Sequence, residues 1–172
     1  VFYLKIRSYL KFGMVSSIIL TIILIGAVNI LVAATNQAQK TLQDQIIMKE
    51  EILRLKDINA NTVNEARYYT YNGLQSHLDA YNAILSEDPY MTSAKLIESL
   101  NVPEQFTNHL LTINELSLQS AALEAAAFEV AESGNLQESQ YMLFEPEYEN
   151  IVSQLEELFA TFSKDLDVWS AQ

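Results

Sequence analysis

The pattern of apolar and polar positions divides the chain into two parts. Residues 12–34 (FGMVSSIILTIILIGAVNILVAA) are almost continuously apolar, and no charged residue occurs between Phe12 and Gln39. At about 1.5 Å per residue, a helix over this run extends about 35 Å, which is enough to cross a hydrocarbon core of about 30 Å. We therefore predict a transmembrane helix over residues 12–35, preceded by a short stub over residues 1–11.

The basic residues around this run predict its orientation. Lys5, Arg7 and Lys11 precede it, and the next basic residue is Lys40. By the positive-inside rule, the stub stays in the cytoplasm and residues 36–172 are exported. A cleaved signal peptide is the alternative, since Val32 is followed by two small residues, but the apolar core of a signal peptide is usually only about 7–15 residues long.

The exported part shows apolar positions at helical spacing. In its first segment, steps of three and four residues connect Met48, Ile52, Leu55, Asn59, Thr62, Ala66 and Tyr69, with a polar layer at Asn59. The last segment repeats this spacing at Ile151, Leu155, Leu158, Phe162, Leu166 and Trp169. No segment alternates with the period of two that a strand requires. The pattern predicts an all-α fold.

Three turn signals separate long helical segments. They are Asn72-Gly73, Asn101-Val102-Pro103 and Ser133-Gly134-Asn135, and glycine, asparagine and proline end helices. We therefore predict helices over residues 36–72, 74–101, 103–133 and 135–172. Pro89 should break the second of these, and Pro146 should separate a short helical turn from a long final helix.

These lengths predict a transmembrane helix that continues into an up-down-up-down four-helix bundle. The first and last helices are the longest, so the last one should return to the membrane near the position where the sequence ends. Trp169 would then lie close to the membrane interface, where tryptophan is common.

Composition excludes several classes of protein. Cysteine is absent, so neither a disulfide framework nor thiol chemistry is available. Lys and Arg number 10 against 22 Asp and Glu, which repels phosphate backbones, and we predict no nucleic-acid partner. All 22 acids lie beyond residue 36 with seven basic residues, so the exported part carries a net charge of about −15.

The sequence offers little for catalysis, and we predict no enzyme activity, no catalytic residue, no cofactor and no metal site. The two histidines, His77 and His109, lie in no metal-binding motif and are expected on solvated helix surfaces. Acidic pairs such as Glu50-Glu51 are also expected on solvated helix faces. Three glutamates near Pro146 could gather a divalent cation, although calcium usually requires more oxygens: Glu145, Glu147 and Glu149.

One cluster favours ligand binding. Asn64, Arg67, Tyr68 and Tyr71 lie within two helical turns and on neighbouring positions of one face. A guanidinium beside phenols can hold a small carboxylate through a bidentate contact. The alternative is structural, with the arginine paired to a neighbouring acid and the tyrosine rings packed between helices.

At this point the chain resembles a known family. Residues 4–30 (LKIRSYLKFGMVSSIILTIILIGAVNI) are similar to the first span of bacterial methyl-accepting chemotaxis proteins. Residues 66–85 (ARYYTYNGLQSHLDAYNAIL) resemble the Ala-Arg-x-Tyr…Gly…Tyr stretch of their extracytoplasmic sensor domains. Residues 94–152 resemble the later pattern, in which a helix rich in Leu and Ala precedes a Gly turn and a Leu-Phe-x-x-Glu-Tyr element.

The resemblance implies the ligand-sensing part of a chemotaxis transducer in the bacterial inner membrane, with its second span and output module absent from this fragment. It implies a homodimer that binds a small molecule or a periplasmic binding protein and passes a helix displacement across the membrane. No arginine follows Arg67, so the amino-acid chemistry of the best-known receptors is not implied.

Three alternatives stay open. The same sensor could belong to a diguanylate cyclase or histidine kinase, since output modules lie downstream. The chain could instead be a membrane-tethered scaffold for protein partners. An enzyme with a carboxylate-bridged metal site would need inward-facing glutamate and histidine residues that the pattern does not place.

Overall fold

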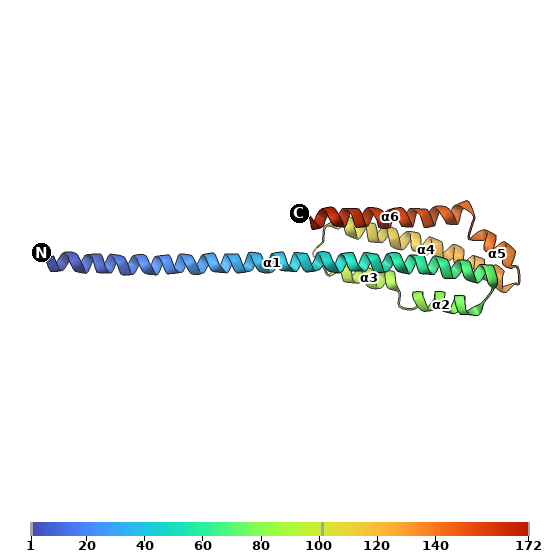
Figure 1. Ribbon diagram of the computed structural model, residues 1–172, viewed down its shortest axis with the longest axis horizontal. Helices are drawn as coiled ribbons and strands as arrows, with labels where there is room; N and C mark the ends of the chain where they lie inside the picture. Colours follow the sequence, from blue (N-terminus) through green and yellow to red (C-terminus); the bar gives the residue numbers. More distant parts are fainter. Residues whose placement is uncertain (1, 101, 172) are drawn as a thin grey trace. The chain divides into compact units, whose positions relative to one another are not determined.

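The computed structural model describes the backbone of residues 2–100 and 102–171, and the side chains of this range from Ser17 onwards. The described residues are all-helical, with no strand (Figure 1). Six helices follow one another along the chain: α1 (Phe2–Asn72), α2 (Gln75–Leu85), α3 (Pro89–Glu98), α4 (Glu104–Glu132), α5 (Leu136–Met142) and α6 (Pro146–Ser170). The predicted all-α class is confirmed.

The breaks lie where the sequence predicts them. Pro89 begins α3, and the Asp88 carboxylate caps that helix by accepting a hydrogen bond from the Met91 N–H at 3.4 Å. Pro146 begins α6 after the short helix α5. A proline in the first turn loses nothing, because its missing N–H would have no partner inside the helix. The predicted ends at residues 101 and 172 lie outside the described residues.

The turn between α1 and α2 depends on glycine. Gly73 adopts a φ of 68°, a left-handed conformation that side chains disfavour, and its N–H donates to the Tyr69 carbonyl at 2.8 Å. The Asn72 side chain accepts a hydrogen bond from the Leu74 N–H at 2.8 Å. A Cβ on Gly73 would lie 3.3 Å from the Leu136 side chain, so α5 packs closely against this turn.

The chain divides into two compact units, residues 1–43 and 44–172, and α1 contributes to both. In the first unit, the apolar side chains from Ile18 to Val32 are half or more exposed to solvent. The stretch Ser17–Asn72 is long and apolar enough to cross a membrane, with a mean hydropathy of 2.6 in its most apolar window. No residue of that window is buried.

In the second unit, α4 packs against α3, α5 and α6, and Figure 1 shows α4 and α6 side by side. The seven positions of the predicted α1 face, from Met48 to Tyr69, are all buried, which confirms the helical periodicity. Their burial supplies the hydrophobic contribution that holds α1 to the other helices of this unit.

The buried residues form two apolar clusters. One lies around Met48, Phe106 and Phe162, and the other around Tyr69, Phe128 and Tyr148. Four buried polar side chains lie at or near the boundary between the clusters along α1 and α4: Asn59, Thr62, Ser120 and Glu124.

Candidate functional site

Arg67 lies on α1 and pairs with an acid on α6. One terminal nitrogen of its guanidinium, Nη2, donates to the Glu149 Oε1 at 2.6 Å. The guanidinium carbon also lies 4.7 Å from the centre of the Phe144 ring and 5.6 Å from that of Tyr148. A cation over aromatic faces gains electrostatic energy from the ring electrons. Arg67 is thus held from two sides and oriented.

A groove between α1 and α6 begins at this arginine. Its volume is about 410 Å³, and Arg67 lines it together with Lys56, Asn59, Ala60, Val63 and Asn64 of α1 and Val152, Glu156 and Phe159 of α6. The Arg67 Nε is buried and has no hydrogen-bond partner among the described residues. The groove therefore combines a guanidinium with an unused donor, an amide, a lysine, a glutamate and an apolar floor, which suits a small polar molecule with a carboxylate.

The structure brings together two of the four residues predicted for a ligand site. Asn64 and Arg67 both line the groove. Tyr68 does not, since its ring packs at 5.2 Å against the ring of His77 on α2. Tyr71 projects into solvent with 65% of its surface exposed. One residue of a helix corresponds to a rotation of about 100°, so Arg67 and Tyr68 face different neighbours.

Both histidines differ from the prediction of solvated surface positions. The His77 side chain is 27% exposed, and its Nδ1 lies 2.7 Å from the Glu65 Oε2. The His109 side chain is 22% exposed, and its Nε2 lies 3.1 Å from the Asp165 Oδ2. Each ring packs partly between two helices, because an imidazole paired with a carboxylate satisfies its polar atoms there.

The expectation for the Glu50-Glu51 pair is wrong for one member. Glu51 is only 8% exposed, and it accepts hydrogen bonds from Arg54 Nη2 at 2.6 Å and from the Ser93 hydroxyl. The hydrogen bonds from Arg54 hold the pKa of the Glu51 carboxyl below its usual value, against the opposing effect of burial. This group ties α1 to α3.

Glu149 belongs to the acidic group near Pro146 that the sequence singled out for a possible cation. In the structure it neutralises Arg67 instead. Among the described side chains, no group of three or more His, Cys, Asp and Glu residues is placed to hold a metal ion. Glu149 lies in the first turn of α6, so its position in that helix could be predicted from Pro146. Its pairing with Arg67, 82 positions earlier in the chain, could not be predicted from the sequence.

A second polar centre, which the sequence did not predict, surrounds Glu124 of α4. This carboxylate is 1% exposed. Its Oε1 accepts hydrogen bonds from the Tyr148 hydroxyl at 2.6 Å and the Ser120 hydroxyl at 2.9 Å, and its Oε2 accepts one from the Tyr81 hydroxyl at 2.6 Å. Glu124 therefore joins α2, α4 and α6 inside the core.

The tyrosines around Glu124 are strongly perturbed. Burial raises the pKa of the Tyr81 and Tyr148 phenols far above their ordinary value of 10.0, and the neighbouring Glu124 carboxylate raises it further. Both phenols stay protonated and act as donors at any physiological pH. A glutamate within an alanine-rich helical stretch carries no local signal of such burial, which is why sequence reasoning missed it.

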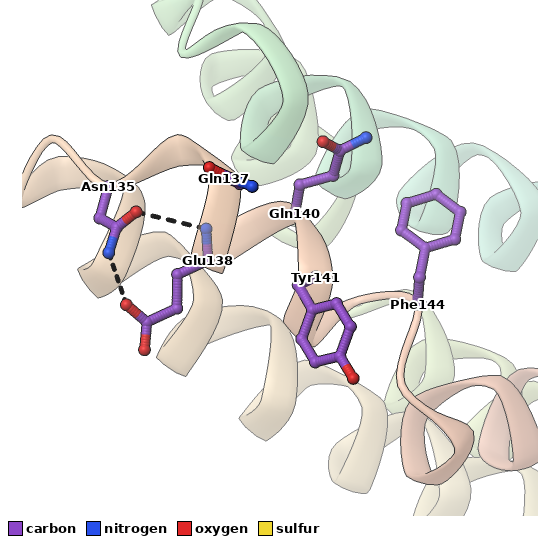
Figure 2. Close-up of a pocket in the computed structure, with 6 residues that line it drawn as sticks. All are labelled: Asn135, Gln137, Glu138, Gln140, Tyr141 and Phe144. Atoms are coloured by element: carbon purple, nitrogen blue, oxygen red, sulfur yellow. Dashed lines mark hydrogen bonds between the residues drawn. The ribbon is translucent and has the colours of Figure 1, made fainter.

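A second hollow lies around α5 (Figure 2). Its volume is about 600 Å³, and Tyr141 and Phe144 line it together with four polar residues: Asn135, Gln137, Glu138 and Gln140. Figure 2 shows Asn135 engaged with Glu138, because its side chain caps the helix by accepting from the Glu138 N–H at 3.3 Å. This hollow has no buried charge to orient a ligand, so the α1–α6 groove is the stronger candidate site.

Comparison of the chain with protein-family models, with curated proteins and with solved structures finds no match.

Proposed function

We propose that the chain is the transmembrane and extracytoplasmic ligand-sensing part of a bacterial chemotaxis transducer. It would lie in the inner membrane with residues 1–11 in the cytoplasm, residues 12–35 across the bilayer and residues 36–172 outside. Support for the span comes from the apolar side chains of the first unit, which are half or more exposed. The sensing unit is then a four-helix bundle, in which α2 and α3 together form the second helix and α5 and α6 the fourth.

The observation that carries the proposal is the groove at Arg67, because both of its walls are the helices that would communicate with the membrane. One wall is α1, which contains the apolar span, and the other is α6, the last helix of the unit. A small molecule in this groove would contact both helices and bias their relative position. Transmission requires only that the ligand binds one arrangement more tightly than the other.

The Arg67–Glu149 ion pair provides a mechanism for that bias. A ligand carboxylate in the groove can compete with Glu149 for Arg67 Nη2, and rotation of the guanidinium would expose the buried, unpaired Nε as a second donor. The Glu149 side chain is 45% exposed, so water can solvate it after displacement. Ligand binding would then exchange a link between α1 and α6 for a link between α1 and the ligand.

Two exposed apolar positions on α1 support the expected homodimer. Ile46 is 52% exposed and Leu53 is 49% exposed. They are seven residues apart and lie on one face, which is the spacing of a helix–helix seam. A second copy pairing along α1 would bury both side chains.

The proposed site is tested by thermal unfolding of the full chain in detergent micelles against small carboxylates, amines and divalent metals. A carboxylate at 100 times its Kd should stabilise the chain by about 2.7 kcal/mol. Arg67→Ala should abolish this stabilisation. Glu149→Gln should strengthen binding several-fold, because it removes the charge that competes for the guanidinium.

Lys49→Ala is the matched control. Lys49 is also a cation of α1 paired with an acid of α6, Asp167, but it lies outside the groove. This variant should retain the full ligand response. A response that survives Arg67→Ala would reject the site while keeping a sensor, and the absence of any response would favour a scaffold or a protein partner.

A further inference from the structure

A small cavity lies beside Glu124, within the boundary between the two apolar clusters. Residues of α1, α2, α3 and α4 line it: Asn59, Thr62, Val63, Leu85, Tyr90, Ser117, Ser120, Ala121 and Glu124. Its volume is about 20 Å³. A polar cavity above about 10–15 Å³ has room for one species of the size of a water molecule.

The polar wall of this cavity offers both acceptors and donors, because the Tyr90 phenol and the Asn59 amide line it beside the hydroxyl groups and Glu124. The Thr62 hydroxyl donates to the Ile58 carbonyl at 2.8 Å, and the Ser120 hydroxyl donates to Glu124 at 2.9 Å. Both hydrogens are thereby engaged, and the oxygen lone pairs remain. The Ser117 Oγ is buried and forms no hydrogen bond of ordinary geometry among the described residues, although its interaction with the Tyr90 phenol opposes the rise in the pKa that burial causes there. Glu124 is the one charged residue of this lining, and its carboxylate repels an anion and attracts a species that offers positive charge or several donors.

The negative charge of Glu124 also favours a cation in this cavity. Its three partners are neutral hydroxyl groups, and it forms no ion pair with any cationic side chain that the structure describes. A buried carboxylate without a positive partner is costly. The net charge of about −15 on residues 36–172 also lowers the potential and favours cations throughout this unit.

We propose that this cavity binds one compact monovalent cation, such as potassium or ammonium, between the Glu124 carboxylate and the hydroxyls of Ser117 and Ser120. Hard oxygen ligands suit such ions. A divalent ion usually requires more carboxylates than the single one available here. The site is independent of the proposed ligand groove, although Asn59 and Val63 border both.

The experiment compares thermal unfolding of the full chain in detergent with potassium, ammonium and tetramethylammonium chlorides at equal ionic strength. Tetramethylammonium screens charge equally but is too large for the cavity. We expect the melting temperature to rise saturably with potassium or ammonium and to stay lower in tetramethylammonium. Glu124→Gln should remove this difference, and Ser117→Ala should raise the half-effective concentration about tenfold.

Glu115→Gln is the matched control, since Glu115 is an exposed glutamate of the same helix, and it should keep the wild-type difference between salts. Equal melting temperatures in all three salts would overturn the proposal and leave water as the occupant. A difference that persists in Glu124→Gln would place the cation elsewhere. If Glu124→Gln does not fold, Ser117→Ala decides, because it removes no charge and no hydrogen bond of ordinary geometry. An unchanged half-effective concentration in Ser117→Ala would overturn the proposal.

Discussion

Removing one hydroxyl from the Glu124 centre gives the most direct test of its role in stability. Tyr148→Phe deletes the donor that lies 2.6 Å from the Glu124 Oε1 and leaves the ring in place. Tyr148 is fully buried, so no water can replace the lost donor without entering the core. The variant therefore isolates a hydrogen bond rather than a packing contact.

The magnitude follows from the charge of the acceptor. A hydrogen bond to a charged group contributes about 1.5–3 kcal/mol, more than a neutral pair, because the buried carboxylate loses stabilisation that nothing replaces. For a folded unit of this size, 1 kcal/mol corresponds to about 3–5 °C in melting temperature. We expect Tyr148→Phe to lower the melting temperature by about 5–15 °C.

The assay is thermal unfolding followed by circular dichroism at 222 nm, with the full chain in detergent micelles. Tyr141→Phe is the control, because Tyr141 is 65% exposed and loss of its hydroxyl should change the melting temperature by no more than about 1 °C. Tyr81→Phe should repeat the large decrease through the other carboxylate oxygen. A Tyr148→Phe variant that unfolds within about 1 °C of the wild type would refute the reasoning.

Three further predictions concern pH, a turn and salt. The raised pKa values of Tyr81 and Tyr148 mean that the unfolded chain releases these protons first, so their stabilisation is complete below the ordinary pKa of 10.0 and declines at higher pH. Urea unfolding between pH 9 and 11 should show this decline, and Tyr81→Phe should reduce it; a flat profile would contradict it. Gly73→Ala should destabilise the chain by about 1–2 kcal/mol in urea unfolding, because it combines a positive φ with a Cβ contact to Leu136, and an unchanged midpoint would count against that geometry. The charge of about −15 beyond residue 36 should lower the melting temperature in very low salt, and equal values in low and moderate salt would argue against self-repulsion.

The buried face of α1 could be predicted from the sequence because it depends on local periodicity. Every position from Met48 to Tyr69 in the predicted series is buried, since a helix rotates each third or fourth residue to the same side. The positions of the helix breaks were equally local. Pro89 and Pro146 lack an N–H, so each interrupts the preceding helix and occupies the first turn of the next one. This effect does not depend on how the helices pack.

Local sequence patterns predicted only part of the candidate site. Arg67 and Asn64 were predicted as ligand-binding residues from their chemistry and spacing, and both line the groove. Tyr68 and Tyr71 lie only approximately on the same side of the helix as Arg67. The Tyr68 ring packs against His77 of α2, and the Tyr71 ring is exposed to solvent, so neither faces α6. Spacing along one helix gives neighbours on that helix and says nothing about which other helix they face.

The sequence by itself determined the helical class, the apolar stretch suited to a membrane, the helix boundaries and the buried face of α1, because each depends on residues close together in the chain. Only the tertiary structure decided that Arg67 meets Glu149 and that Glu124 lies among three hydroxyl groups. Those contacts depend on how far each helix is rotated and shifted against the others. Packing over the whole unit sets that rotation, and no local pattern records it.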